Sequence, residues 1–93
     1  MLNINIKQGL GVFIGDNMKL TIRYATLKNV TGVVSKVNTG NDTPFNFAMV
    51  RGKKIRLNKD VTIELLGVAQ RGDNMFANVG FHADRSIKIQ GDW

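Results

Sequence analysis

LNINIKQGLGVFIGDNMKLTIRYAT, residues 2–26, aligns without a gap on FNFAMVRGKKIRLNKDVTIELLGVA, residues 45–69, at a constant offset of 43. Positions that a strand would turn inward are apolar in both copies, and Gly9 falls on Gly52. The eight apolar pairs are Leu2/Phe45, Ile4/Phe47, Ile6/Met49, Val12/Ile55, Ile14/Leu57, Met18/Val61, Leu20/Ile63 and Ile22/Leu65. Coincidence can align two alternating strands, but here three strands and two turns match. The sequence therefore predicts two copies of one β module.

Each copy is too short to fold alone. A module of about 45 residues buries too small a share of its surface to be stable, so the copies are expected to share one core. We therefore expect a single domain over residues 1–93, made of repeats at about 1–44 and 45–93.

Alternation of period two dominates the chain, and helical spacing is almost absent. Turn sequences such as Gly15-Asp16-Asn17 separate the apolar runs. This pattern predicts an all-β fold with little or no helix, a small closed barrel or sandwich of about nine or ten short antiparallel strands. His82-Ala83-Asp84 is predicted to form a turn. The side chains predicted to pack in the core include Met18, Phe45, Phe47, Met49, Phe76 and Phe81.

Composition limits the cellular setting. No apolar run approaches the roughly 18 residues of a membrane-spanning helix, and residues 1–5 alternate instead of forming a signal-peptide core. The absence of cysteine excludes disulfides and thiolate chemistry and fits a reducing compartment. We expect a soluble, cytoplasmic protein with no membrane partner.

Charge gives the first indication of function. Thirteen Lys and Arg against seven Asp and Glu leave a net charge of +6, which is typical of a small domain that binds a polyanion. Five cations fall within nine residues, and no acid interrupts them: Arg51, Lys53, Lys54, Arg56 and Lys59. Alternation places Lys54 and Arg56 on the face opposite Ile55 and Leu57. The alternative is a basic but merely solvated surface.

Three stretches carry a family resemblance. Residues 1–22 include Lys7, Gly9 and Phe13-Ile14-Gly15-Asp16; residues 60–68 read DVTIELLGV; residues 79–89 read VGFHADRSIKI. Together they resemble the first strand, the third strand and the last-strand region of carbon storage regulator proteins, the Csr/Rsm family. In that family strands of two identical chains interleave into one β structure, which binds two RNA segments and regulates translation.

The resemblance implies a covalent version of such a dimer. The chain would be a monomeric pseudo-dimer, with residues 44–50 serving as the last strand of one copy and the first strand of the next. It also implies a non-enzymatic, RNA-binding regulator of translation in a bacterial cell or a phage-infected host. The family binds RNA through basic residues at the end of the first strand and an arginine past the last strand, where Gly91 stands here.

The candidate nucleic-acid-binding residues combine the resemblance with the charge pattern: Lys7, Arg51, Lys53, Lys54, Arg56, Lys59, Arg85 and Lys88. Phe13, on the outward side between Val12 and Ile14, is the first candidate for base stacking, or else packs against a sheet edge. Tyr24 and Trp93 are weaker stacking candidates.

Other chemistry has little support. A triad of His82, Asp84 and Ser86 would need a pocket that a small β protein rarely has. One imidazole and scattered carboxylates give no metal-ligand spacing, so no catalytic, metal or cofactor site is expected. The competing hypothesis is a protein-binding module of the kind that a virus could encode. Such a module would attach to a host factor or a virion component through a sheet edge or the basic patch.

Overall fold

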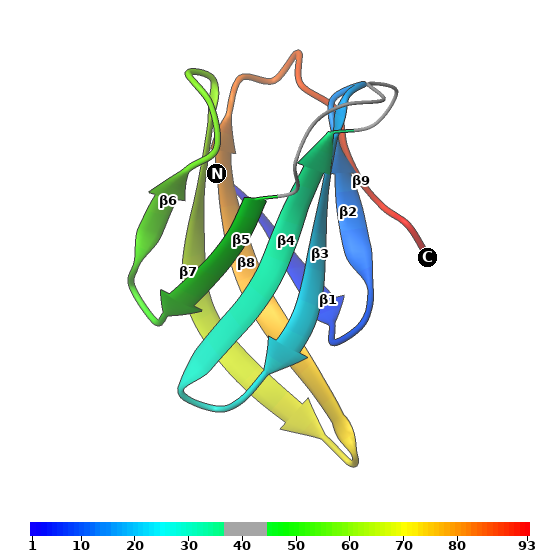
Figure 1. Ribbon diagram of the computed structural model, residues 1–93, viewed down its shortest axis with the longest axis vertical. Helices are drawn as coiled ribbons and strands as arrows, with labels where there is room; N and C mark the ends of the chain where they lie inside the picture. Colours follow the sequence, from blue (N-terminus) through cyan, green and yellow to red (C-terminus); the bar gives the residue numbers. More distant parts are fainter. Residues whose placement is uncertain (37–44) are drawn as a thin grey trace.

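Two antiparallel β-sheets form the chain, whose computed structural model describes residues 1–36 and 45–93 (Figure 1). The first sheet has the strand order β1-β8-β7-β6, and the second has the order β5-β4-β3-β2-β9. The strands are β1 (Leu2–Lys7), β2 (Gly11–Ile14), β3 (Met18–Ala25), β4 (Asn29–Lys36), β5 (Phe45–Val50), β6 (Lys54–Arg56), β7 (Val61–Arg71), β8 (Asn74–Ala83) and β9 (Ile89–Gly91). The all-β prediction is confirmed. Neither sheet closes on itself into a barrel, and no helix in the described part is long and apolar enough to cross a membrane.

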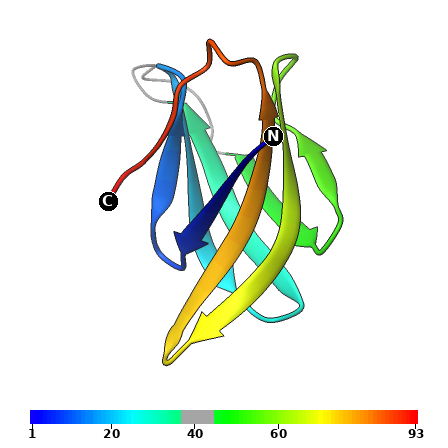
Figure 2. The ribbon, with the colours of Figure 1, turned by 180° about the vertical axis from the view of Figure 1, so that it is seen from behind.

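The two repeats exchange their first strands. β1 belongs to the first repeat but pairs with β8 of the second, and β5 belongs to the second but pairs with β4 of the first. Figure 2 shows β1 (dark blue) alongside β8 (orange). Each sheet therefore combines three consecutive strands of one repeat with the first strand of the other, and β9 adds a fifth strand to the second sheet.

The backbone repeats together with the sequence. Gly9 and Gly52 adopt positive φ angles of 93° and 88° in the turn after the first strand of each repeat, where a side chain would be strained. Their amides donate hydrogen bonds to the carbonyls of Ile22 at 2.7 Å and of Leu65 at 2.8 Å. Strand pairing also shifts register directly after each of these acceptors. The offset of 43 thus relates backbone geometry as well as apolar side chains.

One core lies between the sheets, and both repeats contribute to it. Its buried members are Ile6, Val12, Ile14, Met18, Leu20, Ile22, Ala25, Val30, Val34, Phe47, Met49, Val61, Ile63, Leu65, Ala77, Val79 and Phe81. Burial of these side chains, at about 1.5–3 kcal/mol for each large one, is the main stabilising contribution to the fold.

Equivalent cross-strand pairs fill the core with different residues. Phe47 lies opposite Gly32, whereas the equivalent pair is Ile4 opposite Val79. A Cβ atom added at Gly32 would lie 2.6 Å from the Phe47 ring. The large Phe47 therefore requires a glycine opposite it. The two equivalent pairs differ in their residues but fill a similar volume of the core.

Two sequence predictions are wrong, those for Phe45 and His82, and the prediction that Phe76 packs in the core holds only in part. Phe45 is 55% exposed, because it begins an edge strand that faces the short β6 and is not covered by it. His82 lies in β8, paired with Thr62 of β7, and not in a turn. All six residues of β5 pair with β4 of the first repeat, so the double role expected of this segment stays a prediction; residue 44 lies outside the described residues. Phe76 is only partly buried.

The two sides of the sandwich differ. On one side β9 pairs with the outer edge of β2. On the other side β6 takes the equivalent position in its sheet, yet within residues 1–36 and 45–93 it pairs only with β7. We call these sides the covered edge (β1, β2 and β9) and the open edge (β5 and β6).

The C-terminal residues hold β9 in place. Asp92 accepts hydrogen bonds from the Gly11 amide at 3.2 Å and pairs with the Lys19 ammonium at 3.0 Å. Burial alone would raise the pKa of Asp92, but the bonds from Lys19 and Gly11 and the Lys19 charge together lower it. The Trp93 ring occupies the space where a Cβ of Gly91 would stand. The covered edge is therefore closed by specific contacts.

Candidate nucleic-acid interface

Five cations lie on β6 and in the two turns that flank it: Arg51, Lys53, Lys54, Arg56 and Lys59. We call them the β6 strip. All five side chains are exposed, and none forms an ion pair with another described residue. The strip therefore presents five exposed positive charges close together in sequence, an arrangement that can contact a phosphate backbone.

The β6 strand itself presents the two central cations. Ile55 is partly buried, while Lys54 and Arg56 on either side of it are exposed, as the alternation predicted. Lys54 lies opposite Glu64 on β7, but the Glu64 carboxylate contacts His82 Nε2 at 3.1 Å. The nearest acid across the strand thus already has a partner.

Two ordered turns position the ends of the strip. In the turn between β5 and β6 the Lys53 amide donates to the Val50 carbonyl at 3.0 Å, next to Gly52. In the turn between β6 and β7, Asn58 Oδ1 accepts from the amides of Asp60 and Val61, both at 2.8 Å. These bonds fix the backbone from which Arg51, Lys53 and Lys59 extend.

Arg56 is held more firmly than an ordinary surface arginine. Its Nε donates to the Asn58 carbonyl at 3.2 Å, and its Nη2 lies 3.5 Å from the Lys59 carbonyl. A guanidinium already oriented in this way loses less rotamer entropy when it meets an anion.

A pocket of about 160 Å³ opens between the sheets beside Arg56, and we call it the edge pocket. Its lining residues are Met18, Val34, Lys36, Phe45, Arg56 and Leu57. The floor is apolar, the rim carries two cations, and the exposed Phe45 ring stands at the mouth. The sequence did not predict this site, because its pattern placed Phe45 in the core.

Lys7 lies far from the β6 strip. It ends β1, at the opposite edge of the same four-stranded sheet, about 14 Å away at the usual strand spacing. There it lines a pocket of about 260 Å³ with Asn5, Leu10, Phe76 and Trp93. The end of the first strand and the end of the chain are thus brought together around one cation and two aromatic rings.

Phe13 stands on the outer face of the second sheet and is partly exposed. The Lys19 ammonium lies 5.1 Å from its ring centroid, within the range of a cation–π contact. β2 is three strands from β5 in this sheet, so Phe13 is not part of the open edge. Whether it stacks on a base stays a prediction.

Arg85 and Lys88 lie in the connection from β8 to β9, at the same end of the sandwich as Lys59. The Asp84 carboxylate caps this connection by accepting the Ser86 amide at 2.9 Å, and that hydrogen bond lowers the pKa of Asp84. Asp84 and Ser86 therefore serve a turn, while His82 contacts Glu64 across the sheet. In the part of the chain that the structure describes, no three His, Asp or Glu side chains converge as metal ligands.

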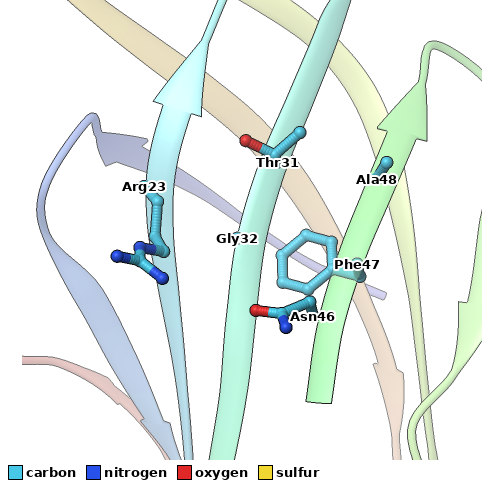
Figure 3. A pocket seen from close by; sticks show the side chains of 6 residues that line it. All are labelled: Arg23, Thr31, Gly32, Asn46, Phe47 and Ala48. Carbon is cyan, nitrogen blue, oxygen red and sulfur yellow. The ribbon is translucent and has the colours of Figure 1, made fainter. Parts of the chain in front are cut away.

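A shallow hollow of about 450 Å³ adjoins β5 on the outer face of the second sheet (Figure 3). Arg23 and Asn46 stand on either side of Gly32, and Thr31 and Ala48 complete its wall. It adds one cation beside the open edge. Gly32 was the feature of the sequence that could have indicated this hollow, because a glycine inside a strand often marks a close approach of neighbouring groups.

Comparison with known proteins adds no identification. No protein-family model, no curated protein and no solved structure matches the chain.

Proposed function

We propose that the protein binds single-stranded RNA through the β6 strip and acts without catalysis as a regulator of translation. The observation that carries this proposal is the strip itself, five exposed cations in sequence along one open edge with no ion-pair partner among the described residues. Phosphate contacts of this kind supply affinity and a strong dependence on salt.

The resemblance to carbon storage regulators supports the regulatory part of the proposal. In that family strands of two chains interleave, and here β1 and β5 are exchanged between two repeats of one chain. The chain would then be a monomeric pseudo-dimer in the cytoplasm of a bacterial or phage-infected cell. The first-strand position that the family uses for RNA carries Lys7 in one repeat, whereas the stronger cationic surface belongs to the other.

A protein partner is the second candidate. One edge of β5 pairs with no other strand among the described residues, and an extended peptide can add to such an edge. The neighbouring β6 argues against it. Lys54 and Arg56 occupy a strand of only three residues, and short charged edge strands resist strand addition. The open edge therefore suits a polyanion better than a peptide strand.

Titration with a short unstructured oligoribonucleotide at two salt concentrations tests the proposal. Binding is expected in the micromolar range or tighter at low salt. The logarithm of the affinity should fall with the logarithm of the salt concentration with a slope of about −3.5 if all five cations engage. No binding at low salt would overturn the RNA proposal and leave the protein partner.

A further inference from the structure

Phe45 is an exposed aromatic ring where the other repeat keeps its ring buried. Phe45 begins β5 opposite Val34, whereas the equivalent Leu2 lies opposite Phe81. Phe81 is 1% exposed and Phe45 is 55% exposed. An exposed ring that lines a pocket offers an apolar face on which a nucleobase can stack.

The edge pocket combines two chemistries that a nucleotide also combines. Met18, Val34 and Leu57 give it an apolar floor, and Arg56 lies at its rim. A nucleobase has apolar faces, which stack on aromatic rings, and a phosphate on each side that a guanidinium binds well. Because Arg56 is already hydrogen-bonded to the neighbouring turn, its guanidinium is oriented before a ligand arrives.

The equivalent place on the covered edge lacks these features. Backbone equivalence relates Phe45 to Leu2, Lys36 to Ala83 and Arg56 to Phe13. The pocket there is lined by Leu2 and Ala83 but also by Ile87 and Ile89, which lead into β9. Its cation, Arg85, has Asp84 beside it. The aromatic residue of that pocket is Phe81, which is buried, whereas the ring in the edge pocket is exposed.

From this comparison we infer that the edge pocket holds one unstacked base of the bound RNA, with Phe45 against the face of the base and Arg56 on an adjoining phosphate. The inference rests on the proposed function and adds a contact that depends on the base. Since the equivalent pocket on the covered edge has no exposed ring, the two repeats do not supply two equal sites.

Fluorescence anisotropy with three labelled probes tests this inference: a ten-nucleotide oligouridylate, an abasic ribose-phosphate strand of the same length, and the deoxyribose form of the oligouridylate. The wild-type protein should bind the oligouridylate roughly 5- to 100-fold more tightly than the abasic strand, the range that stacking of a base on an aromatic ring gives. Tighter binding of the deoxyribose strand would overturn RNA as the ligand.

Two protein variants complete the test. Phe45→Leu, which restores the residue of the other repeat, should bind both ribose strands with the weaker affinity and leave the salt dependence unchanged. Tyr24→Leu is the matched control, because Tyr24 is 58% exposed against 55% for Phe45 and lies on β3, two strands from β5. It should bind as the wild type does.

The outcomes separate the two proposals. If no strand binds at low salt, the proposed function fails and the base site fails with it. If the wild type binds the oligouridylate and the abasic strand with the same affinity, and Phe45→Leu does too, RNA binding stands and the base site is overturned. Thermal unfolding of Phe45→Leu should match the wild type within about 1 kcal/mol, since little of the ring is buried.

Discussion

The open and covered edges are built from equivalent strands, and they end in opposite ways. On β2, whose outer edge pairs with β9, the outward positions are the uncharged Gly11 and Phe13. On β6, the equivalent positions are Lys54 and Arg56, and no described strand covers them. The core positions between them, Val12 and Ile55, remain apolar in both. Equivalent strands can therefore keep one packing scheme while a further strand pairs with one edge and no described strand pairs with the other.

The largest expected effect tests the packing that both repeats share. Gly32→Val should destabilise the fold by about 3 kcal/mol or more, because the new side chain meets the Phe47 ring and the Thr21 carbonyl. Denaturant unfolding would measure it. Adding Phe47→Ile, which recreates the residue types of the equivalent Ile4 and Val79 pair, should recover only part of the loss, because the Thr21 backbone stays in place. An unchanged midpoint for Gly32→Val would contradict the account of the core.

The next effect concerns the open edge. Replacing Arg51, Lys53, Lys54 and Arg56 together with alanine should weaken RNA binding at low salt by roughly 30-fold or more and reduce the salt slope by about 3. The fold should remain, because all four side chains are exposed. Far-ultraviolet circular dichroism is the control. Unchanged affinity in a folded variant would show that the β6 strip is only a solvated surface.

Single substitutions on the two edges separate their contributions to RNA affinity. Arg56→Ala should lower RNA affinity by about fivefold, since an oriented charge-assisted contact is lost. Lys7→Ala, at the covered edge, should change it by less than about twofold. Anisotropy titrations under one salt condition compare them directly. A larger effect of Lys7→Ala would move the RNA site to the pocket around Phe76 and Trp93.

The smallest effect concerns closure of the covered edge. The lowered pKa of Asp92 means that its contribution to stability is present above the ordinary aspartate range, about pH 4, and is lost as the pH falls through the lower pKa of the folded state. Asp92→Asn should remove this dependence and cost less than about 1 kcal/mol, as partly exposed ion pairs do. Trp93, the one tryptophan, reports on β9 by its fluorescence. Identical acid titrations of the wild type and the variant would contradict this role of Asp92.

Alternation and turn chemistry in the sequence were enough to predict the all-β fold, the number of strands and the outward direction of Lys54 and Arg56. They were not enough for Phe45, because its exposure depends on how far the facing strand extends, and β6 has only three residues. His82 was predicted in a turn because local composition favoured one, whereas pairing with β7 extends β8 past it. The edge pocket needed the register of two sheets, which no local pattern contains.

The open and covered edges are expected to differ in RNA binding, with the site on the open edge. Amide NMR spectra recorded during titration with an oligoribonucleotide locate that site residue by residue. The account predicts shifts concentrated in residues 45–61, complete at one equivalent of RNA, with β2 and β9 little changed. Shifts of equal size on both edges, or saturation at two equivalents with equal affinity, would contradict it.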